Sequence, residues 1–101
     1  MNVTYEVQGQ TFEWDSEKAA SNLSKHQISF ERASEVFFDP FVVLVDANDD
    51  EEEDEAREAA IGLTEDWTLL FVVHVIRRED TIRIISAHPA TPSERSEYED
   101  V

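Results

Sequence analysis

The pattern of apolar and polar positions over the first 27 residues predicts a β-hairpin followed by a helix. Residues 3–7 and 11–14 are β-prone runs, and Gly9 between them can supply the turn of the hairpin. Over residues 17–27 the apolar positions recur three and four residues apart, as they do on one face of a helix. We expect that face to be formed by Ala19, Leu23 and His26, with His26 packing the helix against the sheet.

Capping residues mark the starts of three helices. A side-chain oxygen just before a helix accepts a free backbone N–H, and Asp15-Ser16 offers such an oxygen to the first helix. Ser29 can cap a second helix over residues 30–38. Residues 91–94 form a capping box with proline at the first helical position, which predicts a short helix over residues 92–99.

Four further apolar runs predict the strands of a sheet. They cover residues 41–45, 57–63, 67–76 and 81–87. The third run is apolar on both faces, as expected of a central strand. We expect His74 in that run to pack in the core, as well as both tryptophans, Trp14 and Trp67. The order of the elements predicts an α+β fold, with two N-terminal helices packed on an antiparallel sheet and a short C-terminal helix.

Length and composition limit the domain organisation and the location. The 101 residues allow one domain, residues 1–101, and 24 acidic against 8 basic side chains give a net charge of −16. The acids are densest in residues 46–55, where we expect a solvated loop, because the spaced ligands and turn glycine of a calcium loop are missing. No apolar run is long enough to span a membrane, no secretory leader is evident and cysteine is absent, so we expect a cytoplasmic protein.

Four segments stand out by their order and spacing. The first two form the motif Trp14-Asp15-x-x-Lys18-Ala19-x-x-Asn22-x-x-Lys25-His26, preceded by Phe12-Glu13. The third is Ile28-Ser29-Phe30-Glu31 leading to Val36-Phe37-Phe38-Asp39-Pro40, and the fourth is Arg83-Ile84-Ile85-Ser86-Ala87 with Ala90-Thr91, Glu94-Arg95 and Tyr98. Over roughly residues 11–99 the sequence resembles the BrnT family, toxins of bacterial type II toxin–antitoxin systems.

This resemblance implies a fold, an activity and a partner. The fold would be RelE-like, and the activity would be RNA cleavage by a ribonuclease that needs neither a metal nor another cofactor. The partner would be an antitoxin, expected to be of the ribbon-helix-helix type, which covers the toxin, supplies the DNA binding and represses their shared operon. The chain itself would then reach DNA only through the antitoxin.

The sequence offers few side chains for such a reaction. Metal-independent RNA cleavage needs a base for the 2′-hydroxyl proton, a cation for the phosphorane charge and an acid for the 5′-oxygen. Guanidinium groups match phosphate oxygens, and histidine can serve as acid or base near neutral pH. The residues that we expect in these roles are Lys25, His26, Arg83, His88 and Arg95. Glu94 and Tyr98, one helical turn apart, can assist in proton transfer.

Each candidate also has a structural interpretation. Arg83 can pair with an acid on a neighbouring strand, which is as compatible with the sequence as a phosphate role. Lys25 can interact with the helix dipole, Glu94 belongs to the capping box, and Pro89 holds the backbone of His88 extended. The three histidines lack metal-ligand spacing, so we predict no metal site.

Charge and three departures from the family pattern leave a second function open. A net charge of −16 repels RNA at long range. Gln27 replaces the glycine that usually follows the Lys-His pair, His88 replaces an arginine, and Arg95 is alone in a segment that is often rich in arginine. The alternative is a toxin-like binding module with little or no catalytic activity, which serves as the antitoxin's partner in operon autoregulation.

Overall fold

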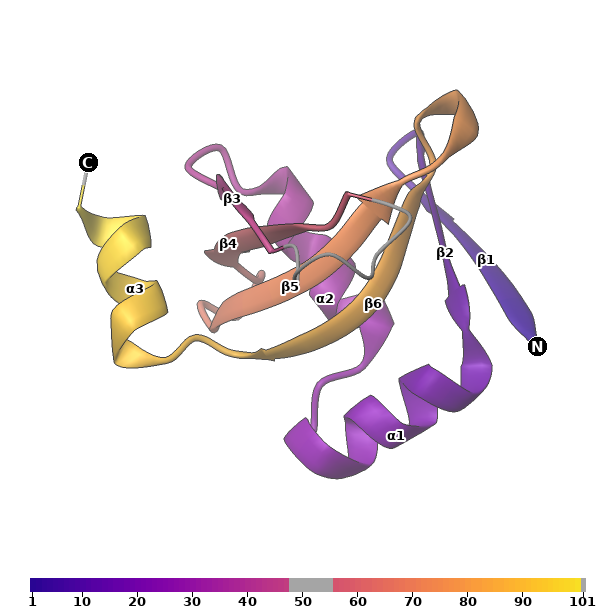
Figure 1. The fold of residues 1–101 in the computed structure, drawn as a ribbon, viewed down its shortest axis with the longest axis horizontal. Coiled ribbons are helices and arrows are strands. Elements are labelled where there is room, and N and C mark those ends of the chain that lie inside the picture. The colour runs from indigo at the N-terminus through magenta and orange to yellow at the C-terminus, as the bar shows by residue number, and fades with distance from the viewer. Residues whose placement is uncertain (48–55, 101) are drawn as a thin grey trace.

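The computed structural model describes residues 1–47 and 56–100, and within these ranges six strands form one sheet (Figure 1). The strands are β1 (Asn2–Val7), β2 (Gln10–Asp15), β3 (Val43–Asp46), β4 (Glu58–Leu63), β5 (Leu69–Ile76) and β6 (Ile82–Pro89). The helices are α1 (Ser16–His26), α2 (Phe30–Ser34) and α3 (Pro92–Glu99), with 3₁₀ turns η1 (Glu35–Phe38) and η3 (Arg78–Asp80). The predicted α+β class is confirmed, whereas most of the predicted acidic loop lies outside the described residues.

The sheet is mixed, so the prediction of an antiparallel sheet is wrong. Its strand order is β1-β2-β6-β5-β4-β3, and every neighbouring pair is antiparallel except β2 and β6. These two strands run parallel and pair at Phe12 with Ile82 and at Glu13 with Arg83. They are far apart in the chain, so no hairpin turn imposes the opposite direction on them. The helices α1 and α2 lie between strands, after the β1–β2 hairpin, and not at the N-terminal end.

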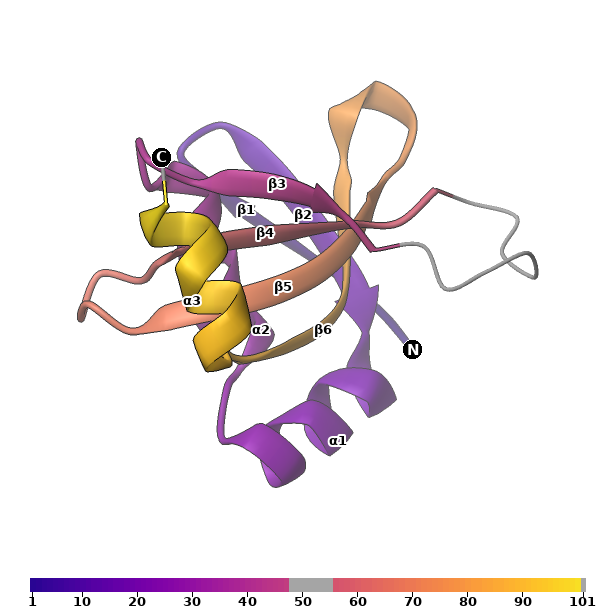
Figure 2. The same ribbon diagram turned by 60° about the vertical axis from the view of Figure 1, so that its left-hand side comes forward.

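The main core lies between the sheet and α2, and α3 lies in front of the other face (Figure 2). Trp14 and Phe30 meet edge to face with ring centroids 5.7 Å apart, which adds about 1 kcal/mol to the burial of their apolar area. Gly62 lets β4 pass close to η1, since a Cβ there would lie 2.9 Å from the carbonyl oxygen of Val36. His74 is buried as predicted, with Nδ1 placed 3.1 Å from a backbone carbonyl.

Helix α1 docks through an amide, and the predicted apolar face is wrong in two of its three members. Leu23 is half exposed and His26 is exposed, whereas Asn22 is buried. The Asn22 amide donates to the carbonyls of Ala87 (2.9 Å) and Ile28 (3.0 Å), and its oxygen accepts from the Ala87 N–H (3.0 Å). The helix therefore lies beside the part of β6 that follows its pairing with β2. The backbone groups on that edge have no strand partner among the described residues, so they need a polar side chain rather than an apolar one.

Trp67 is also placed differently from the prediction. Trp67 is 80% exposed and lies in the turn between β4 and β5, because β5 begins only at Leu69. At the same end of the sheet, where Pro89 pairs with Leu70, β6 continues two residues beyond the predicted strand, so His88 lies within the strand and not after it. Both differences arise at strand ends, where the apolar pattern does not tell strand from turn.

Candidate functional site

The last turn of α1 meets the end of β6, and this contact brings two predicted site residues together. Asn22 fixes α1 to β6 at Ala87. One helical turn after Asn22 stands His26, and one residue after Ala87 stands His88. Their imidazole rings consequently lie 5.9 Å apart between centroids.

His88 is held by a carboxylate and an aromatic ring. Its Nε2 lies 3.0 Å and 3.2 Å from the two carboxylate oxygens of Glu94 on α3. The ring of Phe71, the cross-strand partner of His88 on β5, stacks on the imidazole at 5.0 Å with an interplanar angle of 19°. Within residues 1–47 and 56–100, Nδ1 of His88 has no protein hydrogen-bond partner. The side chain keeps 29% of its surface exposed, so Nδ1 can meet a bound substrate.

Glu94 serves two purposes at once. The capping box predicted for α3 is confirmed: the Thr91 hydroxyl accepts from the Glu94 N–H (3.2 Å), and Glu94 Oε1 accepts from the Thr91 N–H (2.9 Å). The same carboxylate contacts His88. Because the helix cap fixes the carboxylate, the orientation of the imidazole is fixed in turn.

Lys25 and His26 are exposed on the last turn of α1, next to one another. The carbonyl ends of a helix attract positive charge, so this location favours the ammonium group of Lys25. His26 and His88, together with Glu94 and Phe71, form one group, which we call the α1–β6 centre, and Lys25 precedes His26 on the same helical turn. The predicted plug role of His26 against the sheet is wrong, because its side chain is open to solvent.

The two candidate arginines, Arg83 and Arg95, are both paired with carboxylates outside that centre. Arg83 stands five residues before His88 on β6, roughly 16 Å along the strand. Its Nη1 donates to Glu13 (3.0 Å) on the neighbouring strand and to Asn2 (2.8 Å). The sequence left open whether Arg83 binds phosphate or a cross-strand acid, and here it is bonded to the acid. Arg95 follows Glu94 on α3 but forms an ion pair with Glu99 at 3.4 Å.

Tyr98 is hydrogen-bonded to the carboxylate of Asp39, a residue that the sequence indicated only as the end of a helix. Its hydroxyl donates to Asp39 Oδ2 at 2.6 Å, and Asp39 also accepts from the backbone of Leu63 and Phe41. Burial opposes the ionisation of Asp39, but these three hydrogen bonds outweigh it and lower its pKa. Burial and the contact with Asp39 raise the pKa of Tyr98 to about 12. Tyr98 thus ties α3 to the loop after η1, which is a structural role.

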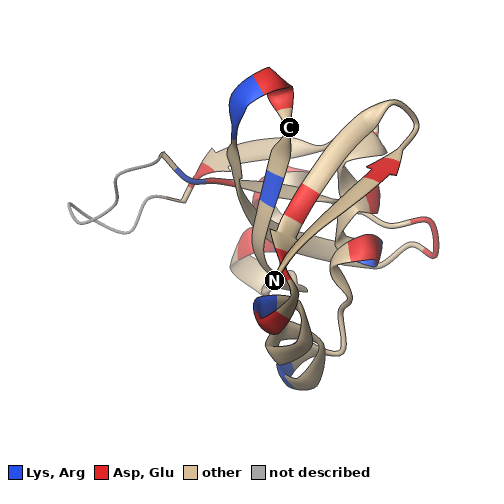
Figure 3. Cartoon of the chain, turned by 90° about the vertical axis from the view of Figure 1, so that its right-hand side faces the viewer, with Lys and Arg blue, Asp and Glu red and all other residues tan. Residues whose placement is uncertain are grey.

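In the view of Figure 3, the segments that carry Lys or Arg are short and lie among segments that carry Asp or Glu, so they form no continuous basic stretch along the described ribbon. Among the described residues, no group of three or more histidine or acidic side chains is arranged to hold a metal ion. In the same residues, no helix is both long and apolar enough to cross a lipid bilayer.

The fold and the α1–β6 centre define a small α+β protein with a histidine–carboxylate cluster where α1, β6 and α3 meet. A sequence model of the family described as the ribonuclease toxin BrnT of type II toxin–antitoxin systems matches residues 14–94, so the chain belongs to this family. The resemblance found in the sequence is therefore confirmed. Membership of a type II toxin–antitoxin family implies an antitoxin as partner.

A solved structure shares the fold. The 1.1 Å crystal structure of the Brucella abortus ribonuclease toxin BrnT superposes with a TM-score of 0.60 at 20% sequence identity, over 77% of this chain and 92% of that one. No curated protein matched the sequence.

Proposed function

We propose that this chain cleaves RNA without a metal ion, with His26 and His88 as the proton-transfer pair, and that a DNA-binding antitoxin of the ribbon-helix-helix type neutralises it in the cytoplasm. The proposal includes a RelE-like fold. The observation that carries it is the 5.9 Å separation of the two imidazole rings. Two proton-transfer groups at that spacing can flank one phosphodiester, each within reach of one of its reacting oxygens.

The surroundings of the two rings suggest which one is the base. Nε2 of His88 faces the Glu94 carboxylate, so Nδ1 can accept the 2′-hydroxyl proton while Glu94 stabilises the imidazolium that forms. The 2′-oxygen then bonds to phosphorus, the bond from phosphorus to the 5′-oxygen breaks, and His26 donates a proton to that oxygen. The products are a 2′,3′-cyclic phosphate and a 5′-hydroxyl, and Lys25 can balance charge on the phosphorane.

The net charge of −16 predicts an unusual salt dependence. RNA binding by a basic protein weakens as salt rises. Here the long-range field is repulsive, and salt screens it over about 8 Å at physiological strength. We therefore expect cleavage at low RNA concentration to become faster as salt rises from a few millimolar.

The test measures cleavage of a labelled RNA by the purified chain in EDTA. His88→Ala and His26→Ala should each reduce kcat at least 100-fold, since general acid–base catalysis contributes about 10²–10⁴-fold. Lys25→Ala should reduce cleavage, and Lys18→Ala, which removes an exposed lysine at the far end of the same helix, should not. Arg83→Ala should lower stability and leave kcat nearly unchanged. Wild-type cleavage by both histidine variants would refute the assignment.

The inactive binding module remains the second candidate, because the carboxylates of Glu13 and Glu99 hold Arg83 and Arg95. This candidate predicts antitoxin binding without RNA cleavage at any salt concentration. An antitoxin complex that represses the operon, formed by a chain with no cleavage between 10 mM and 1 M salt, would favour the module over the ribonuclease.

A further inference from the structure

A cleft of 460 Å³ lies between the tip of the β1–β2 hairpin, η1 and the β4–β5 turn. Its apolar lining includes Tyr5, Phe38, Pro40 and Trp67. None of the residues that line it belongs to the α1–β6 centre, so the cleft is a separate surface. Its most exposed aromatic residue is Trp67, which is 80% exposed.

Trp67 occupies a position that usually holds glycine. The Trp67 N–H donates to the Thr64 carbonyl (3.0 Å), and the Thr64 N–H donates to the Thr68 carbonyl (2.9 Å). These bonds define a three-residue hairpin loop whose last residue adopts a left-handed conformation. Trp67 has φ of 67°, which disfavours a residue with a Cβ and is readily adopted by glycine. A tryptophan at this position lowers the stability of the fold because of its φ angle, and it buries little apolar area in return. The requirements of folding therefore do not account for a tryptophan here.

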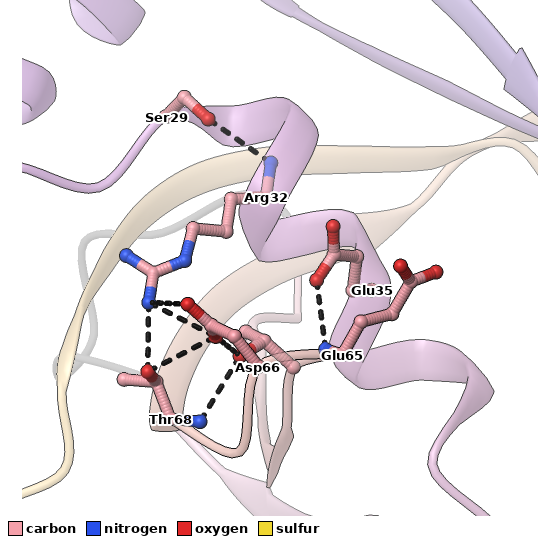
Figure 4. A network of polar contacts seen from close by, with 7 residues as sticks. Ser29, Arg32, Glu35, Glu65, Asp66 and Thr68 are labelled. Carbon is pink, nitrogen blue, oxygen red and sulfur yellow. Dashed lines mark hydrogen bonds and ion pairs between the residues drawn. The ribbon is translucent and has the colours of Figure 1, made fainter.

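A polar network fixes the turn that presents Trp67 (Figure 4). Asp66 accepts from Arg32 Nη2 (3.0 Å) and from the hydroxyls of Thr64 and Thr68. Hydrogen bonds from Thr64 and then Arg32 lower the pKa of Asp66 to about 2, so the network persists at neutral pH. Because the network restrains the backbone of the turn, a partner that covers Trp67 orders only its side chain, which keeps the entropy cost of binding low, as at an interface anchor.

The charges around the cleft select its occupant. Among the residues that the structure describes, the lining of the cleft includes three acidic residues, Glu35, Asp39 and Glu65, and no lysine or arginine. Asp39 is occupied by Tyr98, which leaves Glu35 and Glu65 at the rim, joined by a bond from the Glu65 N–H to Glu35 Oε1 (2.9 Å). Such a rim repels RNA phosphates and a second copy of this acidic chain, and attracts lysine or arginine beside an apolar anchor.

We infer that the cleft docks a segment of the antitoxin in which an apolar side chain packs on Trp67 and Phe38, and flanking lysine or arginine residues face Glu35 and Glu65. The inference rests on the proposed function only for the existence of a protein antitoxin. The surface itself follows from the exposed ring, the rigid turn and the acidic rim.

The test titrates the full chain with the purified protein encoded by the reading frame adjoining its gene, and follows tryptophan fluorescence. Trp14 is buried and Trp67 exposed, and the chain has 2 tryptophans, so a blue shift on binding reports on Trp67. Trp67→Gly removes this reporter, so the Kd of every variant is also measured by titration calorimetry. For Trp67→Gly the Kd should rise at least 100-fold and Tm should rise as well, because glycine relieves the backbone. Ile76→Ala, which changes an exposed apolar residue at the far end of β5, should leave Kd unchanged.

The charge requirement has its own variant. Glu35→Gln combined with Glu65→Gln should raise Kd about tenfold at low salt and less at high salt, whereas Glu97→Gln on the exposed side of α3 should not change it. Cleavage by the free Trp67→Gly chain should equal that of the wild type, so a loss of docking is distinguishable from a failure of the proposed ribonuclease. Unchanged antitoxin affinity in Trp67→Gly, loss of RNA binding in its place, or loss of self-association would each overturn the inference.

Discussion

The amide of Asn22 is the connection on which the α1–β6 centre depends, and its removal is the most informative perturbation of the fold. Asn22→Ala deletes three buried hydrogen bonds, two to Ala87 and one to Ile28. The N–H and carbonyl of Ala87, a fully buried residue, then lose their partner, as does the carbonyl of Ile28, which is 3% exposed. Alanine is too short to restore any of these contacts.

The expected loss of stability is large for a chain of this size. An unsatisfied buried polar group costs about 1–3 kcal/mol, and partial access of water to the gap reduces the sum over three groups to about 3–5 kcal/mol. With an m-value of about 1.5 kcal/mol/M, the urea midpoint should fall by about 2 M or more. A loss of this size is a substantial part of the roughly 5–15 kcal/mol that stabilises a typical domain.

Urea unfolding followed by far-UV circular dichroism measures this loss, with Ser21→Ala as the matched control. Ser21 is the exposed neighbour of Asn22 on α1, and alanine there should be neutral or stabilise the helix by a few tenths of a kcal/mol. Asn22→Asp keeps an acceptor for the Ala87 N–H but sets a carboxylate against two carbonyls, so it should destabilise most at neutral pH and less as the carboxyl protonates. A midpoint for Asn22→Ala within 0.3 M of the wild type, a margin of about 0.5 kcal/mol, would refute this account of the contact.

Three further changes follow from individual positions. Gln27, which ends α1 with φ of 60°, should gain about 0.5 kcal/mol of stability on substitution by glycine, as measured by thermal unfolding; a lower Tm would contradict a strained cap. Gly62→Ala should cost about 1–3 kcal/mol in urea unfolding, because its Cβ would meet the Val36 carbonyl oxygen at 2.9 Å, and an unchanged midpoint would mean that η1 yields freely. Tyr98→Phe should cost about 1 kcal/mol by loss of the bond to Asp39. The stability difference between the wild type and Tyr98→Phe should be complete between pH 3.8 and 10.0. It should decrease below pH 3.8, because the pKa of Asp39 is lowered in the folded state, and from pH 10.0 toward 12, because the pKa of Tyr98 is raised. A stability difference that does not vary over the whole pH range would exclude the bond.

The elements of the fold were predictable because their causes are local. Gly9 adopts φ of 81° in the first hairpin, Ser29 caps α2 by accepting from the Arg32 N–H, and Thr91 begins α3 with its capping box. Each of these signals acts within four residues. A single sequence contains all the information that such contacts need.

The docking of α1 and the exposure of Trp67 were not predictable in this way. Helical periodicity counts apolar positions, and it therefore selected Leu23 over Asn22. The choice is reversed because the helix meets the backbone of β6, and only the completed sheet reveals which backbone groups lack a strand partner. Trp67 is apolar and β-prone, but the turn that excludes it from β5 is held by Arg32, 35 residues earlier in the chain.

By itself, the sequence determined the family, the α+β class and the succession of strands and helices, and it indicated five candidate site residues: Lys25, His26, Arg83, His88 and Arg95. Only the tertiary structure decided that β2 and β6 are parallel, that Glu13 takes up Arg83, and that the rings of His26 and His88 lie 5.9 Å apart. The physical reason is distance along the chain. Residue type and spacing fix local hydrogen bonds, whereas the partner of a side chain more than 60 residues away is fixed by strand register, which depends on how the whole sheet packs.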